Sequence, residues 1–205
     1  MSLNQKKNNV LSPKGKILVF SAASGAGKTT ILNHLKEKLP QLVYSISATT
    51  RQPRVHEKDG VHYFFMQVEE FKSKIKSNEF AEWEEVHGNY YGTPKKFIDA
   101  TVSSGRHIIM DIDVFGKKKM DVAYPEAVGI FISPPSMKEL EKRLYRRKTD
   151  SDGIIKLRLS NAAKEMAFAK EHGKYEYTIE NDCLEETFAE VVSLVKRIIA
   201  QDKTV

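Results

Sequence analysis

The stretch KILVFSAASGAGKTTILNHL, residues 16–35, decides the fold of this chain. Its apolar run at 17–20 predicts a short buried strand, and its second half predicts an amphipathic helix that ends before Pro40. Four more apolar runs follow, at 43–46, 107–113, 128–132 and 177–181. Helical patterns separate or follow them, at 94–104, 136–148, 153–171 and 184–200. Such alternation predicts an α/β core in which five parallel strands form a sheet flanked by helices.

Between the first strand and the first helix lies SAASGAGKTT, residues 21–30, a turn that is typical of a phosphate-binding loop. Gly25 and Gly27 allow the backbone to curl with its N–H groups facing inward, and the following helix directs its positive end at the phosphates. Lys28 can reach the β- and γ-phosphates, and Thr29 can bind Mg²⁺. Ala22 stands where the strict pattern has glycine, but alanine there needs only an ordinary φ. We expect a P-loop NTPase core; the alternative is a small-residue turn with an unrelated lysine.

Residues 51–93 interrupt the alternation, and we interpret them as an inserted small α+β lobe. They contain a strand-like run at 61–66, an amphipathic helical segment, and the polar-aromatic segment EFAEWEEVHGNYYGT at 79–93. At the start of the lobe, Arg51 and Arg54 lie three residues apart in a turn stiffened by proline. Guanidinium groups suit bidentate contacts to phosphate, and a solvated loop is the equal alternative.

Glu82 lies in the apolar frame 80–83, which is unusual for a carboxylate. If it is partly buried, it needs hydrogen-bond donors. Guanine offers two on one edge, its N1–H and its exocyclic amine, whereas adenine has an acceptor at N1. Together with the hydroxyl groups of Ser47 and Thr93, Glu82 would select guanine. The alternative is an exposed strand glutamate among acidic neighbours.

Asp111 and Asp113 follow an apolar run and so stand at the carboxyl end of a central strand, where ligands of open α/β sheets bind. Acids there can hold Mg²⁺, directly or through water, or orient an acceptor. Capping of the next helix is the competing interpretation.

A polar hinge at 148–153 is flanked by Arg143, Arg146, Arg147 and Arg158. Arginines on a mobile segment can close over transferring phosphates and neutralise the charge that develops between them. We therefore predict a helical lid at about 145–157, with a solvated helix face as the alternative.

The chain has 205 residues, 40% hydrophobic and 29% charged, which is typical of a globular domain. Its net charge of +6 permits a nucleic-acid binder, but the lysines of residues 1–16 carry four of those charges and leave the body nearly neutral. No apolar run approaches the length of a membrane span. The polar start and the single Cys183 favour a cytoplasmic protein. We expect a disordered basic tail at 1–15, and neither nucleic acid nor membrane as a partner.

In this order, SAASGAGKTT, SISATTRQPR, EFAEWEEVHGNYYGT, DIDVFG and ISPPSMKELEKRL resemble the guanylate kinases, over about residues 16–199. The resemblance implies a Mg²⁺-dependent enzyme that transfers the γ-phosphoryl group of ATP to GMP or dGMP, as a monomer or homodimer. It implies one domain at 16–200, with a core at 16–50 and 94–200, a GMP-binding lobe at about 51–93 and the lid. The transfer would be in-line without a general base, because the phosphate of GMP is already an anionic nucleophile.

The resemblance also assigns roles to residues of this sequence. For ATP it implies Ser24, Gly25, Ala26, Gly27, Lys28, Thr29, Thr30 and Asn181. For GMP it implies Ser47, Arg51, Arg54, Tyr63, Glu82, Tyr91, Thr93 and Asp113. For catalysis it implies Lys28, Arg143, Arg147 and Arg158, and for Mg²⁺ it implies Thr29 and Asp111.

Three rival functions stay open. A catalytically inactive guanylate-kinase-like interaction module would tend to lack an intact phosphate loop, whereas Lys28 and Thr29 are present here. A related kinase could use another phosphorylated acceptor, which Glu82, Ser47 and Thr93 argue against. A nucleic-acid-dependent ATPase is supported only by the basic charge.

Overall fold

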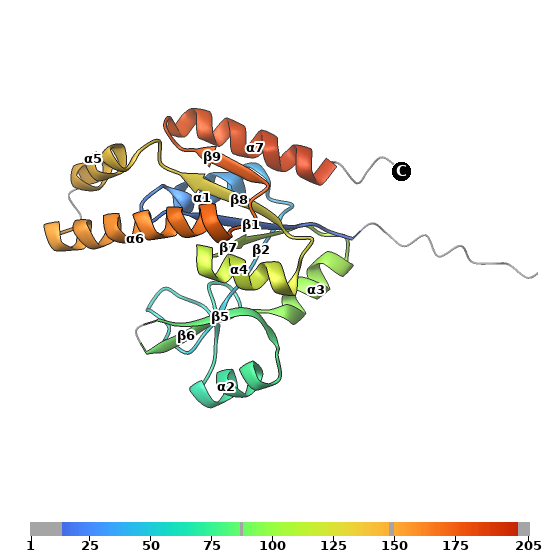
Figure 1. Ribbon diagram of the computed structural model, residues 1–205. Helices are drawn as coiled ribbons and strands as arrows, with labels where there is room; N and C mark the ends of the chain where they lie inside the picture. Colours follow the sequence, from blue (N-terminus) through green and yellow to red (C-terminus); the bar gives the residue numbers. More distant parts are fainter. Residues whose placement is uncertain (1–13, 87, 148–149, 201–205) are drawn as a thin grey trace, which may run out of the picture.

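The larger of two sheets forms the centre of the molecule. A computed structural model describes residues 14–86, 88–147 and 150–200. Five parallel strands lie in the order β2-β7-β1-β8-β9 (Figure 1). They span Ile17–Ala22 (β1), Val43–Tyr44 (β2), Ile108–Asp111 (β7), Val128–Ser133 (β8) and Tyr177–Glu180 (β9). The predicted α/β core with a five-stranded parallel sheet is confirmed.

Helices cover both faces of this sheet, because alternate residues of its central strand point to opposite sides. Leu18 and Phe20 pack in one apolar cluster with helices α1 and α7, whereas Ile17 and Val19 pack in a second cluster with α3 and α4. All six residues of β1 are buried, so the strand that leads into the phosphate loop is held on both faces. The helices around the core span Lys28–Lys38 (α1), Lys95–Ser103 (α3), Val114–Ala123 (α4), Met137–Arg147 (α5), Asp152–His172 (α6) and Leu184–Ala200 (α7).

A second, smaller sheet forms a lobe below the core in Figure 1. Its four strands lie in the order β4-β3-β6-β5 and span Ala48–Thr49 (β3), Phe64–Phe65 (β4), Phe80–Val86 (β5) and Asn89–Pro94 (β6). In helix α2 (Val68–Lys76), Phe71 stacks on Phe80 with ring centroids 4.3 Å apart. Because β3 pairs with β6, this sheet begins before the expected boundary at residue 51.

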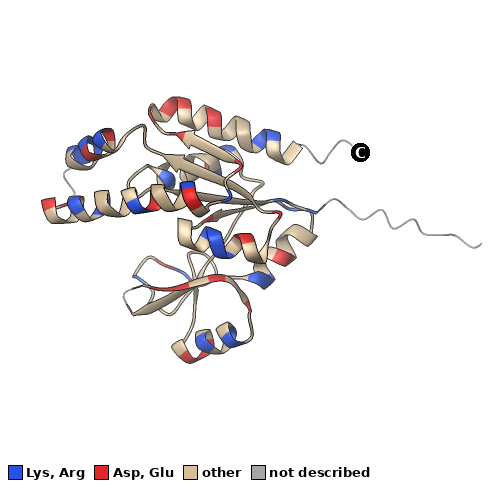
Figure 2. Cartoon of the chain, viewed as in Figure 1, with Lys and Arg blue, Asp and Glu red and all other residues tan. Residues whose placement is uncertain are grey.

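Acidic and basic side chains both occur on the outer helices α5, α6 and α7 (Figure 2). Helix α5 carries more basic than acidic residues, whereas the two signs nearly balance on α6 and α7. No helix in the described ranges combines the length and the apolar character needed to cross a membrane. Residues 1–13 of the expected tail lie outside the described residues.

Helix α4 is fixed to the core by a fully buried lysine. The ammonium group of Lys117 contacts the carboxylate of Asp121 and donates to the carbonyl of Lys174 at 2.7 Å. Gly129 leaves the space for it, since a Cβ there would lie 2.7 Å from Cε of Lys117. Buried charges need such partners. Because α4 begins directly after Asp113, this anchor also positions Asp113 relative to the sheet.

We expect Lys117→Ala to lower the free energy of unfolding by about 3–5 kcal/mol, because it leaves the carboxylate of Asp121 buried without its cation. The matched control is Lys118→Ala, which removes an exposed ammonium group over the ring of Phe168 and should cost about 1 kcal/mol or less. Urea denaturation of both variants measures the difference. Equal losses would contradict the anchoring role of Lys117.

Candidate active site

The loop between β1 and α1 has the backbone that phosphate binding requires. Gly25 and Gly27 adopt left-handed conformations with φ of 84° and 96°, which residues with side chains rarely adopt. Gly27 directly precedes α1, so the unpaired N–H groups of the first helical turn lie at the loop. Ala22 is the last residue of β1 and pairs with Ile132 of β8. The glycine missing from the strict pattern therefore falls on ordinary strand backbone.

Lys28, the first residue of α1, reaches the carboxyl end of the neighbouring strand β7. Its Nζ lies 2.5 Å from Oδ1 of Asp111 and donates to the carbonyl of Ile112 at 3.0 Å. Thr29 beside it is exposed. The Thr29 hydroxyl and the Asp111 carboxylate are the hard oxygen donors that Mg²⁺ prefers, usually completed by water and phosphate oxygens. Among the residues that the structure describes, no cluster of three or more Asp, Glu, His or Cys could hold a metal alone. The two residues thus fit a Mg²⁺ that arrives with a nucleotide.

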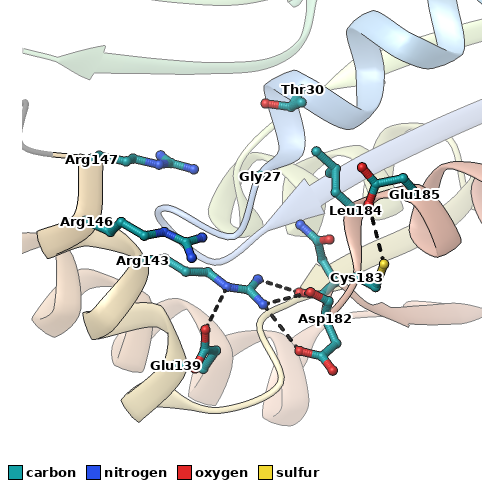
Figure 3. Close-up of a pocket in the computed structure, with 11 residues that line it drawn as sticks. Gly27, Thr30, Glu139, Arg143, Arg146, Arg147, Asp182, Cys183, Leu184 and Glu185 are labelled. Atoms are coloured by element: carbon teal, nitrogen blue, oxygen red, sulfur yellow. Dashed lines mark hydrogen bonds and ion pairs between the residues drawn. The ribbon is translucent and has the colours of Figure 1, made fainter.

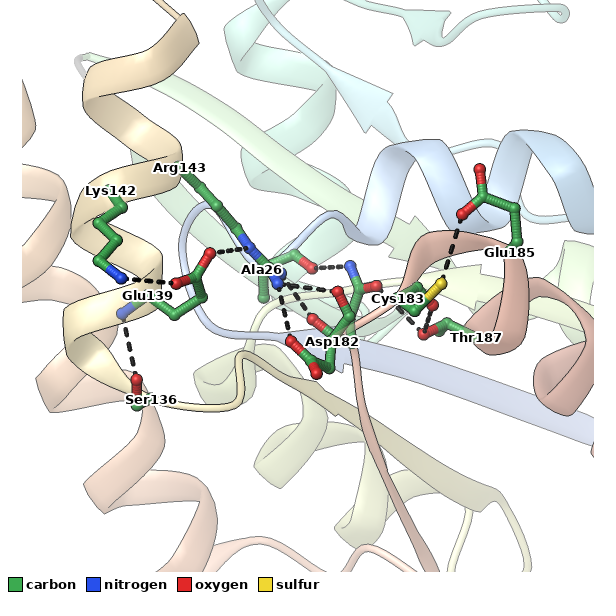
Figure 4. A network of polar contacts seen from close by, with 10 residues as sticks. Ala26, Ser136, Glu139, Lys142, Arg143, Asp182, Cys183, Glu185 and Thr187 are labelled. Carbon is green, nitrogen blue, oxygen red and sulfur yellow. Dashed lines mark hydrogen bonds and ion pairs between the residues drawn. The ribbon is translucent and has the colours of Figure 1, made fainter.

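A network of polar contacts ties three separate segments to the loop (Figure 4). Asn181, buried after β9, donates from Nδ2 to the carbonyl of Ala26 at 2.8 Å, and its Oδ1 accepts from the hydroxyl of Thr187 at 3.1 Å. Arg143 of α5 donates to the carbonyls of Asn181 and Asp182 at 2.6 and 2.9 Å. The amide of Asn181 therefore braces the loop backbone, a contact that the sequence did not indicate.

A cavity of about 540 Å³ opens beside the loop (Figure 3). Arg143, Arg146 and Arg147 line it from α5, Gly27 and Thr30 line it from the loop and α1, and the segment that follows β9 completes it. Its volume is ordinary for a small-molecule site, and the neighbouring guanidinium groups favour an anionic ligand. Arg146 is one of the arginines expected around the hinge, whereas the residues after Asn181 that line the cavity were not predicted as site residues. Their one signal is their closeness to the carboxyl end of a core strand.

Helix α6 carries one expected residue, which contacts Asp150, and one unexpected residue, which contacts the loop. Nη1 of Arg158 lies 3.0 Å from Oδ2 of Asp150, and Arg158 does not line the cavity. Glu165 accepts a hydrogen bond from the N–H of Ser24 at 2.6 Å. The pKa of its carboxyl is raised overall, chiefly by burial, although this hydrogen bond lowers it. The buried residues of α6 recur every seven positions, which is about two turns of the helix. Glu165 comes seven residues after Arg158 and therefore lies on the same face, a signal that could have identified it. Residues 148–149 of the expected lid lie outside the described residues.

Glu82 is half-buried on β5 and paired with the neighbouring strand. Thr93 of β6 donates from Oγ1 to Oε1 of Glu82 at 2.6 Å, and Ser47 directly precedes β3 of the same sheet. The pKa of Glu82 is raised overall, chiefly by burial. The negative charge of Asp113 also raises it, and the hydrogen bond from Thr93 lowers it. Asp113 caps α4 by accepting from the N–H of Gly116 at 2.6 Å. The structure thus shows the capping role for Asp113 that the sequence left open, and it rules out the fully exposed alternative for Glu82.

Arg51, Tyr63 and Tyr91 lie together on the lobe. The Arg51 guanidinium is 5.4 Å from the ring centre of Tyr63, which meets the ring of Tyr91 edge to face at 6.2 Å. Arg51 Nη2 lies 2.9 Å from Oε1 of Glu57, and the same carboxylate accepts from the backbone N–H of Arg54 at 2.8 Å. The hydrogen bond to Glu57 raises the pKa of Arg51 and lowers that of Glu57 to about 2. The sequence did not indicate Glu57, because an acid in a polar turn has no distinctive pattern.

Known proteins share both the sequence and the architecture of this chain. The family model for guanylate kinase matches residues 14–198. The guanylate kinase of Myxococcus xanthus is 45% identical over 189 residues, which cover 91% of this chain and 88% of that protein. That of Bartonella henselae is 47% identical over 197 residues, covering 96% and 84%. The crystal structure of guanylate kinase from Anaplasma phagocytophilum matches with a TM-score of 0.69 and 35% identity, over 95% of this chain and 90% of that one. With this agreement over nearly its whole length, the chain belongs to the guanylate kinase family.

Proposed function

We propose that this protein is a guanylate kinase that transfers the γ-phosphoryl group of ATP to GMP or dGMP, giving ADP and GDP or dGDP. The observation that carries the proposal is the half-buried carboxylate of Glu82, held by Thr93, in a chain with an intact phosphate loop. An ionised carboxylate accepts hydrogen bonds only, so it suits the two donors on one edge of guanine and not the acceptor at N1 of adenine. Membership of the family supports the same acceptor.

For the donor, we infer that ATP places its phosphates in the loop at 24–30, with Lys28 as their cation and Asn181 beside the cavity. Lys28 is already held near the loop by Asp111, so an arriving phosphate would replace that carboxylate as its partner. Thr29 and Asp111 would hold Mg²⁺. When bound, this ion would neutralise part of the negative charge of the phosphates.

For the acceptor, two groups of residues on and near the lobe support the proposal. The guanine group comprises Ser47, Glu82 and Thr93, and the phosphate group comprises Arg51, Arg54, Tyr63 and Tyr91. Asp113 is a further acid at the GMP site. Glu57 holds Arg51 over the ring of Tyr63 and would give way to the phosphate of GMP.

The reaction then requires two anions to approach each other in line. We assign Lys28, Arg143, Arg147 and Arg158 to neutralising the charge between them, and we assign no residue to proton abstraction, because the attacking phosphate oxygen carries no proton that must leave. In this proposal the lobe and the lid at about 145–157 close over the two nucleotides and exclude water. Because the single cysteine suits a reducing compartment, we place the enzyme in the cytoplasm.

Nucleotide selectivity tests the function directly. With saturating ATP and Mg²⁺, ADP release should give a kcat/KM for GMP at least about a hundredfold above those for AMP, CMP and UMP, because each of these leaves polar groups of the acceptor site unpaired. The deoxy nucleotide dGMP should follow GMP. Binding of GMP without turnover would instead favour the inactive interaction module.

Glu82→Gln should raise KM for GMP about 10- to 100-fold and leave KM for ATP nearly unchanged, because it removes a charged acceptor from the guanine contact. Glu85→Gln, an exposed position on the same strand, is the matched control and should have little effect. Steady-state kinetics with each substrate varied in turn provide the measurement. Equal increases in both KM values would contradict the guanine assignment.

Lys28→Ala should lower kcat by about 10²–10³-fold or more, because it removes a cation from the transferring phosphoryl group. GMP affinity, measured by calorimetry, should change less than about twofold. Lys38→Ala in the last turn of the same helix is the control and should retain full activity. If Lys28→Ala weakened GMP binding as strongly as turnover, the division into donor and acceptor residues would be wrong.

A further inference from the structure

A lysine of helix α4 contacts the edge strand of the lobe. Nζ of Lys119 donates to the backbone carbonyl of Trp83 on β5 at 2.5 Å and lies 5.6 Å from the centre of the Trp83 ring. Strand β5 is an edge strand of the smaller sheet, so this carbonyl would otherwise lack a partner within the sheet. Lys119 therefore joins the core to the strand that carries Glu82.

Carboxylates surround this contact. Glu82 and Glu84 are both half-buried and lie on either side of Trp83, where alternation along the strand puts them on one face. The first turn of α4 approaches the same face, since a Cβ at Gly116 would lie 3.3 Å from Oε2 of Glu82. Lys119 is one turn further along α4 and therefore on the same side of the helix as Gly116.

Burial and four side chains determine the pKa of Glu82, which is raised overall. Burial raises its pKa, the hydroxyl of Thr93 lowers it, Asp113 raises it, Lys119 lowers it and Glu84 raises it. The pKa of Glu84 is likewise raised by burial and by Asp113, and lowered by Lys119. Within the described part of the chain, Lys119 is the one cation in this set that opposes the two neighbouring acids.

We propose that Lys119 is a positioning residue of the guanine site, because its ammonium group, hydrogen-bonded to the carbonyl of Trp83, places a positive charge at the strand that carries Glu82. This inference rests on the proposed function, because only a ligand with two donors requires an ionised acceptor at Glu82. A protonated carboxyl would present a hydrogen to one of the guanine donors and lose that contact. Lys119 thus acts on GMP through Glu82 and need not touch the nucleotide.

The test compares Lys119→Met with Lys119→Arg and with the control Lys118→Met, whose ammonium group lies over Phe168 of α6. KM for GMP and for ATP is measured from mildly acidic to mildly alkaline pH at low ionic strength. Lys119→Met should raise KM for GMP about threefold to tenfold at acidic pH, because the pKa of Glu82 rises when the cation is lost. The increase should vanish at alkaline pH, KM for ATP should not change, and Lys119→Arg and Lys118→Met should follow the parent protein.

Two further results strengthen or overturn the inference. Adding Glu84→Gln to Lys119→Met should restore much of the GMP affinity at acidic pH, because it removes a like charge from the same face. The added effect of Lys119→Met should also shrink in high salt. An unchanged pH profile in Lys119→Met, or a KM increase of equal size at every pH, would overturn the proposal in favour of no role or of packing alone.

The failure of this inference is distinguishable from failure of the proposed function. Carbon-13 NMR of the glutamate carboxyl groups follows the titration of Glu82 in the protein without nucleotides. A higher titration midpoint in Lys119→Met supports the charge effect even if the parent protein does not phosphorylate GMP, which would refute the function alone. An unchanged midpoint, together with normal turnover of GMP by the parent protein, would refute the role of Lys119 alone.

Discussion

The site depends on two residues of left-handed backbone, Gly25 and Gly27, at the end of a fully buried strand. Both glycines also permit close approach of other segments. A Cβ at Gly27 would lie 2.6 Å from Nδ2 of Asn181, and a Cβ at Gly25 would lie 3.1 Å from side-chain carbons of Leu140 and Leu144. The segment after β9 and helix α5 can therefore pack directly against the loop. This packing places the arginines of α5 beside the cavity and lets Asn181 brace the loop backbone.

Helix α4 likewise positions the residues around Glu82. Two of its lysines lie two residues apart and so point to different sides of the helix, because successive residues of an α-helix are rotated by about 100°. Lys117 is buried in the core, and Lys119 reaches the edge of β5. The carboxylate of Asp113, which caps the helix, is thereby positioned relative to both sheets. The charge around Glu82 is set by this helix as much as by its own strand.

Several cations of the candidate site are held by carboxylates in the described structure. Lys28 pairs with Asp111, and Arg51 pairs with Glu57. Such pairs order long side chains before any ligand binds, which reduces the entropy lost on binding. They also mean that a phosphate must compete with a carboxylate for each cation. The site therefore favours ligands with several negative charges, which can replace several carboxylates at once.

The sequence by itself determined the five-stranded parallel sheet, most of the helices around it and the glycine loop after the first strand, because periodicity and glycine spacing act between near neighbours in the chain. Its helical patterns did not include α4. It also drew attention to Glu82, whose apolar frame agrees with its half-buried place on β5, while the roles of the candidate residues toward ATP and GMP stay predictions. Only the tertiary structure decided that Glu57 holds Arg51, that Glu165 meets Ser24, and that Asn181 braces a loop 155 positions away in the chain. The last two contacts depend on how whole elements pack, and no local pattern of residues encodes them. The contact of Arg51 with Glu57 is local, but it lies in a polar turn with no distinctive pattern.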